Sequence, residues 1–242
     1  MKKIKKAAEA LPWSLYKNLR TLKAKMSPFA IVMGMHSFFE LPAMTLKEIK
    51  IYKKVLTSLH VDGSLNIFEY GSGFSTLYFA KFLKRKKIPF HIYSIDNNLK
   101  WHQKVKERVI RNGLDNEITL LISEFPPFWE KEGWDWNVSP ECGRFAPQTK
   151  AEFDYINAPL NIGRKFDFIS VDARFRRLCL AIIPQSLKEK GIVFLHDAQK
   201  AKYHEPLSLY RTAGFFDGGK NYFFEKNDWK VWIGSLGDDL PI

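Results

Sequence analysis

The stretch of sequence that decides the fold is Asn66-Ile-Phe-Glu-Tyr-Gly-Ser-Gly-Phe-Ser-Thr76. Its apolar first half, with the preceding leucine, predicts a short buried strand over 65–70, and Gly71 predicts a tight turn at the end of that strand. Apolar residues at helical spacing then predict a helix over 75–86. A strand, a glycine turn and a helix in this order are typical of ligand-binding units in doubly wound α/β proteins.

The same alternation continues on both sides of this stretch. Upstream, Thr45 and Glu48 have capping-box spacing and open an amphipathic helix over 46–59. Downstream, helical patterns around 101–109 and over 175–188, with a kink expected at Pro184, separate short apolar runs. These runs predict further strands over 90–95, 118–122, 166–171 and 191–195. Buried strands separated by helices predict a parallel sheet with helices on both faces.

The C-terminal segment has a different pattern. Residues 222–225 and 229–233 are strand-like and are separated by three polar residues, which predicts an antiparallel hairpin. Residues 124–165 show no clear periodicity, so we predict an irregular, aromatic-rich insertion there. The predicted fold class is therefore α/β, with a doubly wound, mostly parallel, Rossmann-like sheet and a C-terminal antiparallel hairpin.

Composition and charge divide the chain into an extension over 1–44 and one domain over 45–242. The 242 residues are 45% hydrophobic, enough for one substantial core, and carry a net charge of +12. The first 25 residues hold eight lysines and arginines against a single glutamate, so this arm would suit weak contact with a membrane surface or nucleic acid, or would be a solvated tail. Residues 29–39 are mostly apolar but too few to span a bilayer. The two cysteines, Cys142 and Cys179, favour a reducing compartment, so we expect a cytoplasmic protein, with peripheral attachment to a membrane as an option.

The central stretch has the features of a nucleoside site. Gly71 permits the tight turn, Gly73 allows a ligand to approach the backbone, and the first turn of the following helix offers free N–H groups. Glu69 could attract an ammonium group, and Asp96, at the end of the second predicted strand, could accept hydrogen bonds from ribose hydroxyls. Dinucleotide sites usually carry a third glycine where this chain has Phe74-Ser75-Thr76, which argues against NAD.

Residues 69–76 resemble motif I of the class I S-adenosylmethionine (SAM)-dependent methyltransferases. Residues 166–176 and 187–197 resemble the fourth and fifth strands of that family, and the resemblance extends over about 45–235. It implies that SAM is the cofactor. The implied cofactor-binding residues are Glu69, Gly71, Ser72, Gly73, Ser75, Thr76, Asp96, Asn97, Ser123 and Glu124.

Charged residues follow the fourth and fifth predicted strands. Asp172 follows the fourth strand and His196-Asp197 follow the fifth, so all three should face the crevice at the carboxyl ends of the strands. There His196 could act as a general base oriented by either aspartate, and Arg174 and Arg176 could bind an anionic substrate. Alternatively, Asp172, His196 and Asp197 could bind Mg²⁺ or Mn²⁺, or could serve local structure alone.

The resemblance implies a methyltransferase acting on an oxygen of a small molecule or glycan. An RNA methyltransferase is one alternative because the chain is basic, although Asp172-Ala-Arg-Phe175 lacks the Pro-Pro of amino-methylating enzymes. An NAD(P)-binding oxidoreductase is another. The insertion would be either a lid over the acceptor or a loop anchored on the core. Its aromatic residues are Phe125, Phe128, Trp129, Trp134, Trp136, Phe145, Phe153 and Tyr155.

Overall fold

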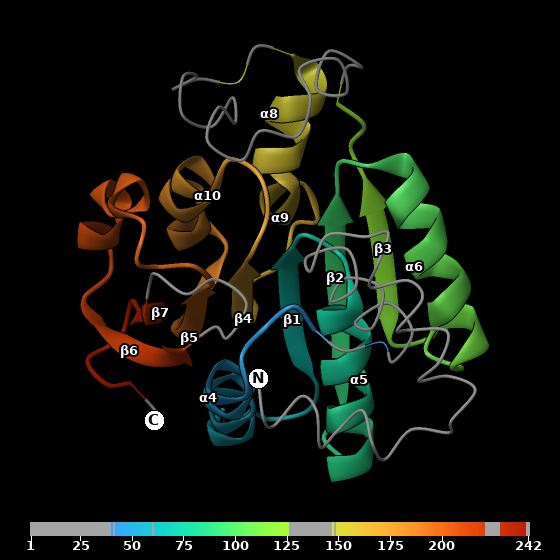
Figure 1. Ribbon diagram of the computed structural model, residues 1–242, viewed down its shortest axis with the longest axis horizontal. Helices are drawn as coiled ribbons and strands as arrows, with labels where there is room; N and C mark the ends of the chain where they lie inside the picture. Colours follow the sequence, from blue (N-terminus) through green and yellow to red (C-terminus); the bar gives the residue numbers. More distant parts are fainter. Residues whose placement is uncertain are drawn as a thin grey trace, which may run out of the picture.

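The computed structural model describes residues 40, 42–59, 61–125, 147, 149–220 and 228–240. Seven strands form a single sheet in the order β3-β2-β1-β4-β5-β7-β6, as Figure 1 shows. The first five pair in parallel, and β7 runs antiparallel to both of its neighbours. The strands are β1 Leu65–Tyr70, β2 Phe90–Asp96, β3 Ile118–Ile122, β4 Phe166–Val171, β5 Leu187–Leu195, β6 Thr212–Lys220 and β7 Asp228–Ser235. The predicted fold class is confirmed.

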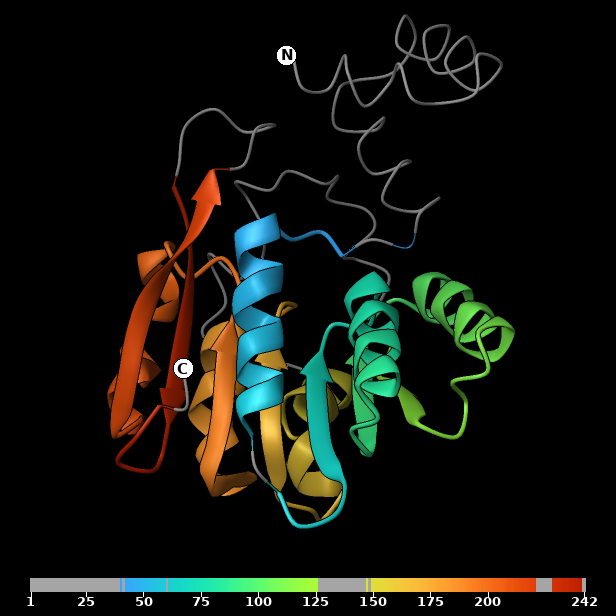
Figure 2. The same cartoon turned by 90° about the horizontal axis from the view of Figure 1, so that it is seen from below.

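Helices cover both faces of the sheet (Figures 1 and 2). One face packs on α4 Leu46–Ser58, α5 Phe74–Lys86 and α6 Leu99–Arg111. The other packs on α8 Lys150–Ile156, α9 Ala158–Asn161 and α10 Arg176–Ile182. Alternation of side chains along a strand supplies both layers: Ile67 of β1 faces the first group of helices, whereas Phe68 and Tyr70 face the second. No helix in the described part of the chain is both long and apolar enough to cross a membrane.

Phe168 in β4 lies at the centre of the first core layer. Its side chain is fully buried, and its ring lies 4.8 Å from that of Tyr52 on α4. We expect Phe168→Ala to lower the free energy of unfolding by about 3–5 kcal/mol, because the packing loses a large buried ring and retains a cavity. Phe153→Ala, at a side chain that is 51% exposed, is the matched control and should cost less than about 1 kcal/mol. Equal losses in urea unfolding of the two variants would contradict this placement of the core.

The helix predicted over 175–188 is shorter than expected, and the fifth strand is longer. The α-helix ends at Ile182, a 3-10 turn over Ile183–Gln185 contains Pro184, and β5 already begins at Leu187. Leu187 pairs with Phe166, after which the register shifts, so that Phe168 pairs with Ile192. Residues 187–190 have helix-forming side chains, but pairing with β4 outweighs that local preference.

The prediction of an irregular segment over 124–165 was wrong for its second half, which contains α8 and α9. Thr149 and Glu152 form a capping box at the start of α8, the same spacing that marks α4. The short length of both helices hides their periodicity in the sequence. Residues 126–146 and 148 lie outside the described residues.

The C-terminal hairpin is present, but its first strand lies earlier than predicted. The strand that pairs with β7 is Thr212–Lys220, and residues 222–225 lie outside the described part of the chain. Three glycines, at 214, 218 and 219, weaken the strand pattern of β6, and its register shifts between Asp217 and Gly219, where φ is +90°. Two 3-10 helices, η3 Ala201–Tyr203 and η4 Glu205–Leu209, connect β5 to β6.

Candidate active site

The turn between β1 and α5 lies at the carboxyl edge of the sheet, between the ends of β2 and β4. Gly71 has φ +98°, and its N–H donates to the carbonyl of Ile95 at 2.8 Å. A Cβ atom at Gly71 would lie 2.6 Å from the carbonyl oxygen of Asp172 and 2.9 Å from Cβ of Ala173. Both the backbone conformation and this close contact therefore require glycine.

Gly73 is the N-cap of α5 and differs from Gly71. Its backbone is extended, which any residue can adopt, and a Cβ atom there would meet nothing closer than Ser75 Oγ at 3.8 Å. Neither strain nor packing among the described residues requires a glycine at this position. Close approach of a ligand to the backbone, at the N-terminus of a 13-residue helix, is the remaining physical reason for it.

Glu69 is buried beneath the turn and holds it in place. Its Oε1 accepts a hydrogen bond from Ser75 at 2.7 Å, and its Oε2 accepts hydrogen bonds from Thr76 and from Ser94 at 2.8 Å. The hydroxyl of Thr76 in turn accepts from the N–H of Gly73 at 2.9 Å. Burial raises the pKa of Glu69 to about 7, although hydrogen bonds from the three hydroxyl groups stabilise the charged carboxylate and oppose this rise.

Because the pKa of Glu69 is raised, the free energy of unfolding should depend on pH in a way that can be measured. Below pH 4.5 the carboxyl group of Glu69 is protonated in both the folded and the unfolded state. Between pH 4.5 and about 7 the unfolded chain loses this proton while the folded chain keeps it. The contribution of Glu69 to the free energy of unfolding therefore falls as pH rises. Glu69→Gln lacks this titration and should gain about 3 kcal/mol relative to the wild type between pH 4.5 and pH 8. Urea unfolding across this range measures the difference, and Glu107→Gln on the exposed surface of α6 corrects for loss of a carboxylate in general. A difference independent of pH would contradict the burial of Glu69.

Asp96 ends β2 on the other side of the turn. Its Oδ1 accepts from the N–H of Asn98 at 2.8 Å, and burial raises its pKa to about 6. Helix α6 is capped by Asn98, whose side chain accepts from the N–H of Trp101, so Asp96 does not serve as the N-cap. The positive charge of Arg174, from the segment after β4, opposes the rise in the pKa of Asp96. Asp96 and Arg174 thus interact across the end of β1.

The remaining predicted cofactor residues surround the same end of β2. The hydroxyl of Ser72 is buried without a hydrogen-bond partner among the described residues, and its carbonyl accepts from Trp101 Nε1 at 2.7 Å. Ser123 donates its N–H to the carbonyl of Asp96 at 3.0 Å and its hydroxyl to the carbonyl of Ala151 at 2.7 Å. The carbonyl of Asn97 accepts from the N–H of Phe125, and Glu124 is exposed. The structure therefore brings all the predicted cofactor residues to one edge of the sheet.

A cluster of charges joins the ends of β4 and β5. Arg176 forms ion pairs with Asp172 at 2.8 Å and with Asp197 at 3.3 Å, and it also donates to the carbonyl of His196 at 2.7 Å. Lys200 forms a second ion pair with Asp197 at 2.7 Å. Burial raises the pKa of Asp197, but the charges of His196, Arg176 and Lys200 outweigh burial and hold this pKa well below its usual range. Of the two arginines predicted near Asp172, Arg176 takes the central position, and the positive charge of Arg174 acts on Asp96.

Both ring nitrogens of His196 face carboxylates. Nδ1 lies 3.0 Å from Asp172 Oδ1 and 3.8 Å from Asp197 Oδ1, while Nε2 lies 3.2 Å from Glu48 Oε1. Burial lowers the pKa of His196, but the three negative charges outweigh burial and raise it well above its usual value. The surrounding carboxylates therefore favour the protonated, cationic form of the imidazole. Nδ1 is within hydrogen-bond distance of Asp172, whereas Nε2 faces Glu48 Oε1 without a hydrogen bond among the described residues.

Glu48 is a site residue that the sequence analysis identified solely as part of a capping box. Its side chain is fully buried; Oε2 accepts from the N–H of Thr45 at 2.7 Å, while Oε1 faces His196. A capping glutamate needs one oxygen for the cap, so the second is available for another partner. Glu48 lies at helical spacing from the apolar residues Tyr52 and Val55, on the face of α4 that is otherwise apolar. A charged residue on such a face is the sequence signal that could have identified it.

The cluster does not fit a metal ion in this conformation. No group of three or more His, Cys, Asp or Glu residues in the described ranges has the arrangement needed to hold one. The charges explain why: Arg176, Lys200 and protonated His196 already balance the carboxylates of Asp172, Asp197 and Glu48. A divalent cation would have to displace these internal cations.

Of the aromatic residues proposed for an acceptor lid, three are described. Phe125 and Tyr155 are buried in the core, with ring centroids 5.3 Å apart, as the alternative of a loop anchored on the core predicts. Phe153 is 51% exposed. The residues Phe128, Trp129, Trp134, Trp136 and Phe145 lie outside the described residues.

Comparison with known proteins places this geometry in a family. Residues 68–198 match the model of a methyltransferase domain. A structure assigned as a caffeoyl-CoA O-methyltransferase from Staphylococcus aureus is similar over 90% of this chain and 98% of that one, with a TM-score of 0.53 and 15% identity. Spermidine synthase from Thermotoga maritima is similar over 82% of this chain and 61% of that one, with a TM-score of 0.51 and 12% identity. At these identities the two structures support the fold alone. A search of curated protein sequences found no significant match.

Proposed function

The chain belongs to the methyltransferase-domain family and is a SAM-dependent methyltransferase, and from this premise we propose that it methylates an oxygen atom of a small molecule or glycan. The observation that carries this proposal is the contact between the two halves of the site. The position of a Gly71 Cβ lies 2.6 Å from the carbonyl oxygen of Asp172, so the cofactor turn directly adjoins the charged cluster. An acceptor bound over the cluster would lie beside the cofactor.

The residues around the glycine turn fit SAM. The N-terminus of α5 suits the carboxylate of its amino-acid part, and the carboxylate of Asp96 suits the ribose hydroxyls. The buried hydroxyl of Ser72, which has no hydrogen-bond partner in the described part of the chain, offers a further hydrogen bond. Glu69 supports these groups from below through its three hydroxyl partners. When bound, the cofactor supplies an activated methyl group on sulfur.

Within the cluster, Asp172 is the group best placed to receive the acceptor's proton. Its side chain is 29% exposed, whereas those of His196 and Asp197 are 6% and 9% exposed. In the proposed reaction the acceptor oxygen bonds to the methyl carbon, the sulfur–carbon electron pair stays on sulfur, and Asp172 takes the hydroxyl proton. Arg176 and protonated His196 hold Asp172 in place, so the role of base that the sequence suggested for His196 passes to Asp172.

The proposal needs no metal ion, because the internal cations already neutralise the carboxylates. We therefore expect dialysis against EDTA to leave the rate of methyl transfer within about twofold of the untreated protein, since no step uses the metal-bound oxygen that a divalent cation would provide. The rate is measured as formation of S-adenosylhomocysteine. Loss of activity that Mg²⁺ or Mn²⁺ restores would show instead that Asp172, His196 and Asp197 rearrange into a metal site.

An acceptor screen tests the proposed reaction class. The protein is incubated with isotopically labelled SAM and separate panels of phenols, sugars, carboxylic acids, amines and total RNA, and products are identified by mass spectrometry. We expect a labelled O-methyl product from an oxygen-bearing acceptor. Labelling confined to RNA or to amines would contradict the proposal.

A further inference from the structure

The folded domain carries a strong charge asymmetry that is separate from the basic N-terminal arm. Residues 46–111, which include α4, α5 and α6, hold 14 lysines and arginines against five acidic residues. Three of the five, Glu48, Glu69 and Asp96, are buried. Residues 112–242 hold 16 basic residues against 19 acidic ones. The excess positive charge of residues 46–111 therefore lies mainly on α4, α5 and α6. These three helices cover the same face of the sheet (Figures 1 and 2).

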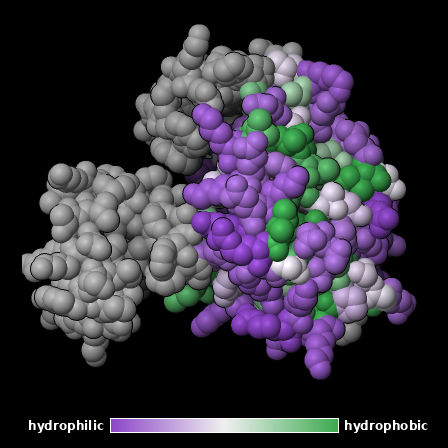
Figure 3. All heavy atoms as spheres, turned by 90° about the vertical axis from the view of Figure 1, so that its right-hand side faces the viewer, coloured by the Kyte–Doolittle hydropathy of each residue, from purple (hydrophilic) through white to green (hydrophobic). Residues whose placement is uncertain are grey.

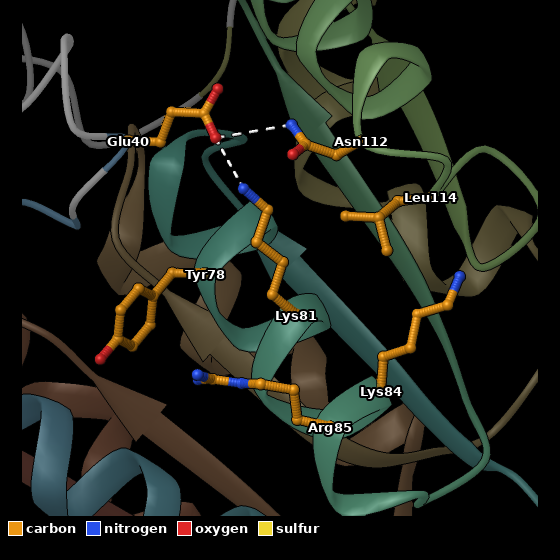
Figure 4. A pocket seen from close by; sticks show the side chains of 7 residues that line it. All are labelled: Glu40, Tyr78, Lys81, Lys84, Arg85, Asn112 and Leu114. Carbon is orange, nitrogen blue, oxygen red and sulfur yellow. Dashed lines mark hydrogen bonds and ion pairs between the residues drawn. The ribbon is translucent and has the colours of Figure 1, made fainter.

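A hollow of about 430 Å³ lies within this basic side, against the outer surface of α5. Its cationic lining comes from Lys81, Lys84 and Arg85, as Figure 4 shows. Lys81 is paired with Glu40 at 2.7 Å and Lys84 with Glu117 at 2.8 Å, whereas Arg85 is exposed and has no ion-pair partner among the described residues. Lys86 and Lys87 follow directly and are also exposed. These three adjacent cations face solvent at the C-terminal end of α5.

Apolar side chains are exposed on the same side. Ile110 on α6 is 57% exposed, and Leu99, three helical turns earlier on the same stripe, is 37% exposed. Exposed Lys106 lies between them on this stripe. Figure 3, which views the side of α6, shows hydrophobic residues scattered among hydrophilic ones. A mixture of basic and aliphatic side chains is typical of helices that lie on a membrane surface.

The chain enters the described structure at this hollow. Glu40, which lines it and pairs with Lys81, directly follows the apolar residues 29–39. The Glu40–Lys81 ion pair therefore holds the first described residue of the chain against the basic side of the domain. A basic surface with exposed aliphatic side chains combines the electrostatic and the apolar contributions to membrane binding.

From these observations we infer that the side formed by α4, α5 and α6, with Arg85, Lys86 and Lys87 at its exposed edge, docks on an anionic membrane surface. The phosphate groups of acidic lipids match its charge, and the exposed aliphatic side chains match the interfacial region below them. Nucleic acid would match the charge as well, but its phosphates make no use of exposed Ile110 and Leu99. The inference is independent of the proposed acceptor.

Cosedimentation of the full chain with lipid vesicles tests the inference. We expect binding to vesicles of phosphatidylcholine that contain phosphatidylglycerol and none to phosphatidylcholine alone. Reversing two charges in R85E/K86E should lower the partition coefficient by at least about 30-fold at physiological salt, because each basic side chain near an anionic surface contributes about fivefold. The matched control, K165E/K190E, makes the same change of charge outside residues 46–111 and should bind within about threefold of the wild type.

The possible outcomes separate this surface from other sources of binding. Both variants keep the N-terminal arm, so wild-type binding by R85E/K86E would assign attachment to the arm and overturn the inference. Equal losses in R85E/K86E and K165E/K190E would show that net charge alone acts, and would overturn it too. So would binding of the wild type to RNA without binding to anionic vesicles. Retained affinity for SAM in each variant shows that the domain has folded.

Discussion

Replacing Asp172 by asparagine should lower kcat by about 100-fold or more while affinity for SAM stays within about threefold, because positioned proton transfer typically contributes a factor of 10²–10⁴. The substitution preserves the size of the side chain but removes the charge that pairs with Arg176 at 2.8 Å and with His196 at 3.0 Å. The acceptor hydroxyl then lacks a carboxylate to take its proton. Rates come from the formation of S-adenosylhomocysteine with an acceptor found in the screen, and affinities come from calorimetry.

Asp167→Asn is the matched control for Asp172→Asn. Asp167 is a buried carboxylate at the start of β4, with an ion pair to Lys188 at 2.8 Å and a hydrogen bond from the N–H of Asn66 at 2.9 Å. The two residues stand near opposite ends of the same strand, so Asp167→Asn should lower stability but leave kcat unchanged. A rate near that of the wild type in Asp172→Asn, or equal losses of rate in the two variants, would show that Asp172 has no part in proton transfer.

The second large effect is expected at the glycine turn. Gly71→Ala should lower affinity for SAM by at least about 100-fold and destabilise the fold by several kcal/mol, because it adds both backbone strain and a contact at 2.6 Å with the carbonyl oxygen of Asp172. Gly113→Ala separates the two causes. Gly113 also has a positive φ, +60°, but a Cβ atom there meets nothing within 4 Å, so its cost of about 1 kcal/mol measures strain alone.

Gly73→Ala keeps this prediction testable even if Gly71→Ala does not fold. A Cβ atom at Gly73 has room among the described residues, so stability should change by less than about 1 kcal/mol. Affinity for SAM should still fall by at least about tenfold, because the methyl group would occupy the space through which the cofactor approaches the backbone. Unchanged affinity in Gly73→Ala would place the cofactor elsewhere.

Structural features that depend on residues close in the chain could be predicted from the sequence, and most strands of the parallel sheet are among them. The glycine turn after β1, the acid at the end of β2 and the capping box of α4 each depend on residues close in the chain. By contrast, β6 was missed because three glycines dilute its pattern and pairing with β7 supplies the missing preference. The start of β5 was missed for the same reason: Leu187 lies in a helix-forming sequence but pairs with Phe166.

The chemical state of the site depends on contacts that no local pattern contains. His196 has the sequence signature of a base, yet Glu48, Asp172 and Asp197 converge on it from two strand ends and a helix and raise the pKa of its ring. The sequence offered Arg174 and Arg176 for this site, and the structure pairs Arg176, the first residue of α10, with both aspartates. Residue types at strand ends locate a site, but tertiary packing determines which group accepts a proton.

Titration calorimetry of the full chain with SAM, S-adenosylhomocysteine and NAD tests the central claim most directly. The fit of the turn to a single nucleoside predicts that one molecule of SAM or S-adenosylhomocysteine binds to each chain and that NAD does not bind. Asp96→Ala should weaken the binding of SAM and of S-adenosylhomocysteine by at least about tenfold, because hydrogen bonds to the ribose are lost. Binding of NAD in preference to SAM, or binding of SAM that is unaffected by Asp96→Ala, would contradict it.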